Sequence, residues 1–181
     1  MAARTRRTSP GTRLCCAALA LVAACQFAPT RSLAAPWPEW LQGQWAGARR
    51  DGSNGSTAPM QFSVRPILAG AGFTEDLEVR GERSVYRGFA AIVFDREQAR
   101  WVMQYANAGK GHFARLESDP GGEPLVFRSV TPDRTDDSAL TYERRGDGGL
   151  VRTMRVAERG ASADPAAWRV LWQDELQRVI R

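Results

Sequence analysis

The sequence predicts an all-β protein, a single antiparallel barrel of about eight to ten strands that follows a signal peptide. From Trp45 onward, hydrophobic and polar residues alternate in short runs, which is the pattern of strands with one buried face. Glycine, proline, aspartate and serine gather between these runs, which recur at a spacing of roughly ten residues, as in barrels and sandwiches. We favour the barrel because closure leaves no sheet edge exposed.

Residues 1–35 have the three parts of a secretory signal peptide. Five arginines and no acidic residue make this segment positively charged. Leu14–Cys25 is an apolar run of 12 residues, shorter than the roughly 20 that a membrane-spanning helix needs. Ser32-Leu33-Ala34 or Leu33-Ala34-Ala35 then fits a signal peptidase site. We therefore expect one domain at residues 36–181, exported to the periplasm or secreted.

A second cleavage site is an alternative. Leu21–Cys25 resembles the bacterial lipobox, in which the cysteine is lipidated and becomes the new N-terminus. In that reading Cys25 anchors the protein to a membrane. The sequence has no cysteine after Cys25, so neither site leaves a disulfide within the domain.

The charge balance argues against a nucleic-acid partner. The chain has 25 basic and 20 acidic residues, and the five arginines of the leader account for the whole excess. Residues 36–181 therefore carry no formal net charge, whereas nucleic-acid and membrane surfaces attract basic domains. We expect no nucleic-acid partner, and membrane contact only through a lipid on Cys25.

Each predicted strand is an alternating run bounded by turn residues. The runs, in order, are Gln44–Arg50, Pro59–Leu68, Phe73–Arg80, Ser84–Phe94, Arg100–Tyr105, His112–Glu117, Leu125–Val130, Ala139–Arg144, Leu150–Glu158 and Trp168–Leu176. Pro36–Leu41 can form a short helical turn before them. Asp174–Ile180 is compatible with helix, but the alternation of Trp168, Val170 and Trp172 favours a strand with these three on one face.

Four short motifs, in this order, resemble an uncharacterised bacterial family of lipocalin-like proteins in the calycin superfamily. The motifs are the Leu-x-Gly-x-Trp-x-Gly opening at Leu41–Gly47, the hairpin Arg65–Gly70, the strand end Gly88–Asp95 and the aromatic start Arg100-Trp101-Val102. The resemblance implies a closed antiparallel barrel with an internal cavity. The family has no settled activity, so it implies no catalytic residues.

The resemblance also implies a structural plug. In lipocalin-like folds the Gly-x-Trp tryptophan closes one end of the barrel, and an arginine near the C-terminus stacks on it. Gly43 and Trp45 match the opening motif, and Arg178 or Arg169 fits the stacked arginine.

The chain offers little for metal or covalent chemistry. His112 is the only histidine, and the domain has no cysteine, so a zinc site is not expected. Asp133, Asp136 and Asp137 lie in a predicted turn, but their spacing does not match a calcium loop. Haem bound through His112 alone is an alternative, because some haem sites use a single protein ligand. We expect no cofactor and no metal, and nucleophile and phosphate-loop motifs are missing.

The alternating faces suggest a site for a small hydrophobic molecule inside the barrel. The expected cavity-lining residues are Phe62, Trp101, Met103, Tyr105, Phe127, Met154 and Trp172. An alternative is that these side chains fill the barrel completely and the protein acts as an interaction module. Another is an enzyme, a hydrolase or isomerase acting on a lipid-like substrate in the same cavity. A titratable group deep in the barrel would favour the enzyme, and the sequence does not fix the oligomeric state.

Overall fold

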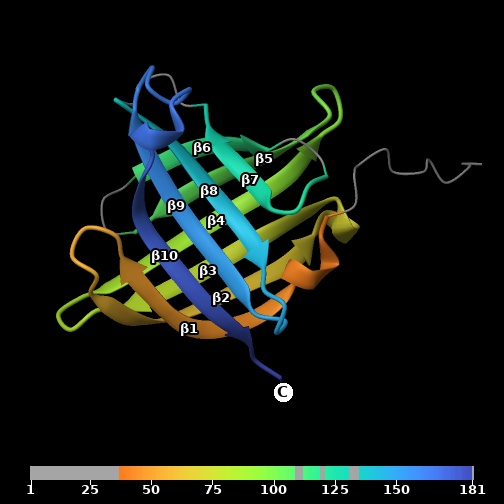
Figure 1. The fold of residues 1–181 in the computed structure, drawn as a ribbon. Coiled ribbons are helices and arrows are strands. Elements are labelled where there is room, and N and C mark those ends of the chain that lie inside the picture. Colours follow the sequence, from red (N-terminus) through yellow and green to blue (C-terminus); the bar gives the residue numbers. More distant parts are fainter. Residues whose placement is uncertain (1–36, 109–111, 119–120, 131–134, 181) are drawn as a thin grey trace, which may run out of the picture. The chain divides into compact units, whose positions relative to one another are not determined.

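The computed structural model describes residues 37–108, 112–118, 121–130 and 135–180. It shows a closed barrel of ten antiparallel strands (Figure 1). The strands are β1 (Gly43–Asp51), β2 (Thr57–Ile67), β3 (Gly72–Arg80), β4 (Val85–Asp95), β5 (Arg100–Asn107), β6 (His112–Ser118), β7 (Leu125–Ser129), β8 (Asp136–Arg144), β9 (Leu150–Glu158) and β10 (Arg169–Arg178). The prediction of an all-β antiparallel barrel is confirmed.

Each strand pairs with its neighbours in the chain, and β1 pairs with β10 to close the sheet. Along strands such as β2, β3 and β4 buried residues alternate with more exposed ones, so the alternation read from the sequence is the inward–outward alternation of the barrel. The β1–β10 seam is tight at Gly47, where an added Cβ atom would lie 1.9 Å from the carbonyl oxygen of Glu175. Only glycine fits at this position.

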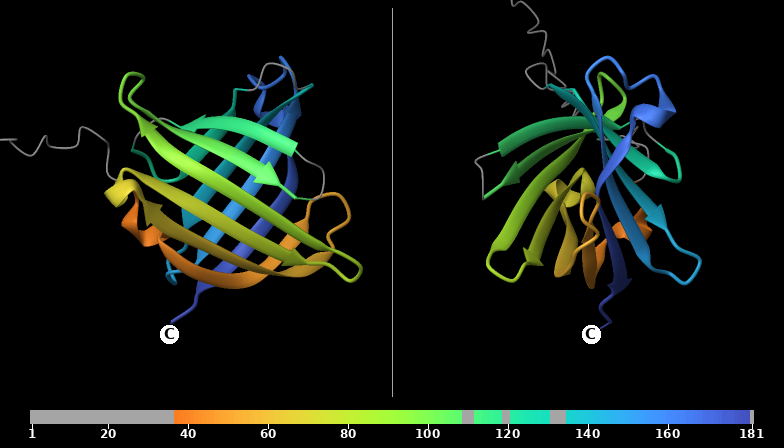
Figure 2. Two further views of the ribbon diagram at one scale, coloured as in Figure 1. Left: turned by 180° about the vertical axis from the view of Figure 1, so that it is seen from behind. Right: turned by 60° about the vertical axis from the view of Figure 1, so that its left-hand side comes forward.

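Two short 3₁₀ helices, η1 (Glu39–Leu41) and η2 (Leu68–Gly70), lie at the same end of the barrel. They are the orange and yellow coils that lie together in Figures 1 and 2. A third, η3 (Pro165–Ala167), precedes β10 at the opposite end, and Asp164 caps it by accepting a hydrogen bond from the amide of Ala166. We call the two ends the η1 end and the open end; the second name denotes only the end that carries the β1–β2 and β3–β4 turns.

Two local expectations were wrong. Asp136 and Asp137 do not lie in a turn but begin β8, because they pair with Glu158 and Ala157 at the end of β9. Trp168, Val170 and Trp172 do not share one face, because the β9–β10 register shifts at a bulge between Val170 and Trp172.

Candidate functional site

Stacked aromatic side chains fill the barrel at the η1 end. The Trp37 ring stacks on Phe73 with centroids 4.6 Å apart and meets Trp101 edge-on at 4.9 Å. Phe127 lies 6.4 Å from Trp37, and all four side chains are buried. Such contacts add to the stability gained from burying the rings. Trp101 and Phe127, expected at a cavity wall, therefore lie in a packed core.

Trp45 and Arg178 are direct partners in the β1–β10 register. The buried Trp45 donates its indole N–H to the carbonyl of Leu41 at 3.0 Å, which ties η1 to the barrel wall. The Arg178 guanidinium lies 4.8 Å from the centre of the Trp45 ring and donates to the carbonyl of Trp40 at 2.6 Å. An added Cβ atom at Gly43 would lie 3.2 Å from Nη1 of Arg178, so the small residue leaves space for the guanidinium. These contacts hold η1 against the barrel wall.

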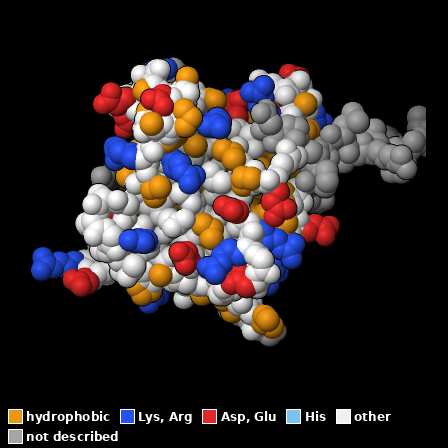
Figure 3. Space-filling model, in the orientation of Figure 1, with side chains coloured by type: hydrophobic (Ala, Val, Ile, Leu, Met, Phe, Trp, Pro, Cys, Tyr) orange, Lys and Arg blue, Asp and Glu red, His pale blue; other side chains and the backbone are white. Residues whose placement is uncertain are grey.

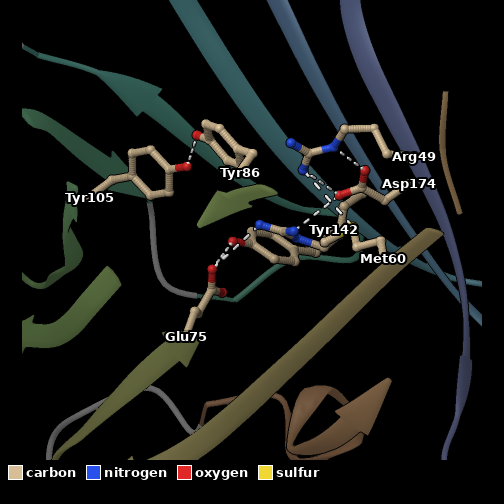
Figure 4. A network of polar contacts seen from close by, with 8 residues as sticks. Arg49, Met60, Glu75, Tyr86, Tyr105, Tyr142 and Asp174 are labelled. Atoms are coloured by element: carbon tan, nitrogen blue, oxygen red, sulfur yellow. Dashed lines mark hydrogen bonds and ion pairs between the residues drawn. The ribbon is translucent and has the colours of Figure 1, made fainter. Parts of the chain in front are cut away.

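The middle of the barrel contains a cluster of buried polar side chains from strands that are far apart in sequence. Tyr142 on β8 donates its hydroxyl hydrogen to Oε2 of Glu75 on β3 at 2.8 Å. Arg152 on β9 places Nη2 3.5 Å from the same oxygen and donates from Nη1 to Oδ2 of Asp174 on β10 at 3.1 Å. Figure 4 shows Glu75 and Tyr142 meeting across the interior. All four side chains are buried.

Arg49 completes this cluster from β1. Its Nε and Nη2 atoms donate to the two carboxylate oxygens of Asp174 at 2.7 and 2.9 Å, a bidentate pair. Its guanidinium lies 3.9 Å from the centre of the Trp172 ring, and that of Arg152 lies 4.1 Å from the ring of Phe62. Two arginines thus face two carboxylates. We call Arg49, Glu75, Tyr142, Arg152 and Asp174 the interior polar cluster.

Burial governs the protonation of the cluster. Burial raises the pKa of Glu75, and the charge of Arg152 and the hydrogen bond from Tyr142 offset only part of this effect. Burial and the neighbouring Glu75 carboxylate also raise the pKa of Tyr142. Burial alone would lower the pKa of Arg152, but Tyr142, Glu75 and Asp174 outweigh it and raise that pKa. Tyr142 therefore stays neutral and Arg152 stays charged, while Glu75 holds a proton more readily than a carboxyl group in water does.

Two atoms of the cluster have no hydrogen-bond partner. They are Oε1 of Glu75 and Nε of Arg152, and the described residues contain one more such buried side-chain atom, Nε1 of Trp37 at the η1 end. Buried polar groups are almost always paired, because an unpaired one costs about 1–3 kcal/mol. Two such atoms in one cluster are therefore a sign of a missing partner.

Half-buried side chains lie on the open-end side of the cluster. Tyr86, Tyr105, Met154 and Trp172 point into the barrel and pack against the core. Tyr86 and Tyr105 share a hydrogen bond between their hydroxyl groups (Figure 4). Gly88 makes this possible, because a Cβ atom there would lie 2.5 Å from the Tyr105 hydroxyl oxygen. We call these four side chains the open-end ring.

The expected cavity residues divide between two environments. Phe62, Trp101, Met103 and Phe127 are buried in the core, whereas Tyr105, Met154 and Trp172 belong to the open-end ring. His112 begins β6, but its side chain lies outside the described residues, as do Cys25 and Asp133. In the described part of the chain, histidine, cysteine and acidic residues do not form a group of three that could hold a metal ion.

The interior polar cluster was not predicted from the sequence, although a signal was present. Glu75 alternates with Phe73 and Leu77, and Asp174 alternates with Trp172 and Leu176. A charged residue at an inward position of an otherwise apolar face is the mark of a buried polar site. The sequence does not say which charges meet, because β3 and β8 come together only when the barrel closes.

The outer surface has a separate groove of about 700 Å³ across β1–β5. Polar side chains, including Gln44, Gln61 and Asn107, line it together with Phe89, which is 44% exposed. Elsewhere, the face in Figure 3 has acidic, basic and hydrophobic side chains interspersed. The groove is a competing site for any small ligand, so binding experiments must separate it from the open-end ring.

Comparison of the sequence with protein-family models and with curated proteins found no match. None of the helices in the described residues has the length and hydrophobicity needed to cross a membrane.

Proposed function

We propose that this protein is an exported lipocalin-like barrel of the calycin superfamily that binds a small, largely apolar molecule through its open end. The closed ten-stranded barrel and the order of the sequence motifs support the family. Lipid attachment at Cys25 is the alternative to a free periplasmic or secreted form. The mass of the mature N-terminus decides between them, because a start at Ala35 or Pro36 excludes the lipid.

The observation that carries the binding proposal is the pair of unpartnered atoms next to a half-buried aromatic ring. Glu75 Oε1 and Arg152 Nε are buried without partners. The Arg152 guanidinium lies 5.6 Å from the centre of the Trp172 ring, and Trp172 is only half-buried. The polar cluster is thus in contact with a side chain that reaches the surface. A ligand with its apolar part among the open-end ring would bring a polar group to these atoms.

The open-end ring suits an apolar ligand body. Two tyrosines, a tryptophan and a methionine offer flat and adaptable apolar surfaces. Burying the apolar surface of a ligand gains about 25 cal/mol for each Å² removed from water. In this proposal the Tyr86 and Tyr105 side chains turn aside to admit the ligand.

A blocking substitution tests the location of the site. Ala58 on β2 is half-buried against the core and pairs with Arg49, so it lies at the open end. We expect the neutral probe N-phenyl-1-naphthylamine to fluoresce on binding to the purified protein, and Ala58→Trp to abolish the signal by occupying the site. Ala46→Trp is the matched control, because Ala46 lines the outer groove. Loss of the signal in Ala46→Trp alone, or no signal in the unmodified protein, would contradict the proposal.

An enzyme remains a second candidate because Glu75 is a titratable group deep in the barrel. A buried carboxyl group with a raised pKa is the usual form of a general acid or base. Tyr142 holds it in place by donating to Oε2. Turnover of a short-chain p-nitrophenyl ester that Glu75→Gln abolishes without loss of fold would establish a hydrolase. Turnover that survives this substitution would exclude Glu75 as the catalytic group.

A further inference from the structure

We propose that the ligand presents an uncharged hydroxyl-type head group to Glu75 Oε1 and Arg152 Nε, and that the barrel discriminates against carboxylates and amines of the same size. This inference deepens the proposed function and rests on it. It follows from the charge balance of the interior polar cluster and from the hydrogen-bonding capacity of the two free atoms.

The charges of the cluster are already compensated. Asp174 receives two hydrogen bonds from Arg49 and one from Arg152, and Glu75 pairs with Arg152. When Glu75 is ionised, two positive charges balance two negative charges. A charged head group entering this buried region would have no free counter-charge, and an uncompensated buried charge is strongly unfavourable.

The two free atoms require a partner that both donates and accepts. Arg152 Nε carries a hydrogen and can only donate. Glu75 Oε1 accepts when the carboxyl group is ionised and can donate when it is protonated. A hydroxyl group has one hydrogen and two lone pairs, so it can satisfy both atoms in either protonation state of Glu75. The head group therefore need not change its own charge on binding.

A charged head group can make a favourable contact with only one of the two free atoms. A carboxylate can accept from Arg152 but repels Glu75 and Asp174. An ammonium group can donate to Glu75 but repels Arg152 and Arg49. Binding sites reject close analogues of their ligand by leaving a charge of the analogue unpaired. We expect the discrimination against each charged analogue to be about tenfold or more in affinity.

The test uses three ligands with the same alkyl chain: n-decanol, decanoate and decylamine. Each is titrated into the purified protein by competition with N-phenyl-1-naphthylamine at about pH 9, because the ionised form of Glu75 is favoured at high pH while decylamine is still protonated. We expect n-decanol to bind at least about tenfold more tightly than decanoate and decylamine. Equal or tighter binding of either charged ligand would contradict the preference for a neutral head group. It would not contradict the proposed binding site. No binding of any of the three would overturn both proposals.

The substitution Glu75→Gln tests whether Glu75 itself recognises the head group of the ligand. Glu75→Gln removes one negative charge while keeping an acceptor for the Tyr142 hydroxyl. It should narrow the preference for n-decanol over decanoate several-fold, because decanoate no longer meets that charge. Glu78→Gln is the matched control, since Glu78 lies on the outer face of the same strand and pairs with Arg80 and Arg87. An unchanged preference in Glu75→Gln, or an equal change in Glu78→Gln, would refute the role of Glu75.

Discussion

Replacing Arg152 with methionine should destabilise the protein strongly, because this residue compensates both interior carboxylates. Its guanidinium contacts Glu75 at 3.5 Å and Asp174 at 3.1 Å, and all three side chains are almost completely buried. Methionine keeps an apolar chain against Phe62 but removes the charge. Asp174 would retain the two hydrogen bonds from Arg49, whereas Glu75 would retain only the one from Tyr142. Glu75 is therefore the group left uncompensated.

The expected loss of stability comes from the Glu75 carboxylate, which stays buried without its charged partner. Removing one partner of a buried ion pair costs about 3–5 kcal/mol, because the remaining charge is buried without a partner. We expect Arg152→Met to lower the free energy of unfolding by about 3 kcal/mol at pH above neutral, the lower part of that range, because Glu75 can escape by taking up a proton. Folded domains are stable by roughly 5–15 kcal/mol, so the variant should still fold.

Urea denaturation followed by tryptophan fluorescence measures this cost. The double variant Arg152→Met/Glu75→Gln should recover about 2 kcal/mol of it, because glutamine brings no charge and still accepts from Tyr142. A double-mutant cycle with the Glu75→Gln single variant isolates the coupling between the two residues. A loss below about 0.5 kcal/mol in Arg152→Met, typical of surface substitutions, would refute the buried compensated cluster.

Three further predictions concern the plug, the open end and the pH response. Arg178→Ala should cost about 1–2 kcal/mol of unfolding free energy, because it removes the cation–π contact with Trp45 and one hydrogen bond. Gly88→Ala should displace the Tyr105 ring and change the near-ultraviolet circular dichroism, because the added methyl group would lie 2.5 Å from its hydroxyl oxygen. The raised pKa of Glu75 means that the folded state holds this proton more tightly than the unfolded state does. Stability should therefore fall as pH rises from about 4.3, the unfolded value, through the folded pKa, and Glu75→Gln should remove that decline in thermal unfolding.

Matched variants control these three predictions. Arg169→Ala removes an exposed arginine from the other end of β10 and should change stability by no more than about 0.5 kcal/mol. Gly146→Ala adds a methyl group where no atom lies within 4 Å and should leave the spectrum unchanged. Glu143→Gln replaces an exposed acid and should preserve the pH dependence. An effect in a control as large as in its test variant would contradict the corresponding explanation.

The strand pattern was predictable because the pleat of a β-strand produces a repeat of two residues in the sequence. A residue's inward or outward position repeats every two residues, so each alternating run marked a strand. The start of β8 at Asp136 was not predictable from the same signal. Its first residues are polar, and they are strand only because the end of β9 lies beside them. Pairing between strands, rather than local propensity, fixed that boundary.

The interior polar cluster and the half-buried side chains beside it were predictable only in part. Tyr105, Met154 and Trp172 were expected to line a cavity, and in the structure they are half-buried and pack against the core. The charged residues beside them were not identified, because arginine and acidic residues are frequent along the whole domain and most lie on its surface. Glu75 and Arg152 become partners only through the closed sheet. The bulge after Val170 also redirects β10, and alternation alone gives no sign of it.

A crystal structure of the protein with bound n-decanol tests the central claim most directly. The account predicts the alkyl chain among the open-end ring and the hydroxyl oxygen within hydrogen-bonding distance of both Glu75 Oε1 and Arg152 Nε. An alcohol seated in the outer groove, or a hydroxyl group turned away from these two atoms, would contradict it.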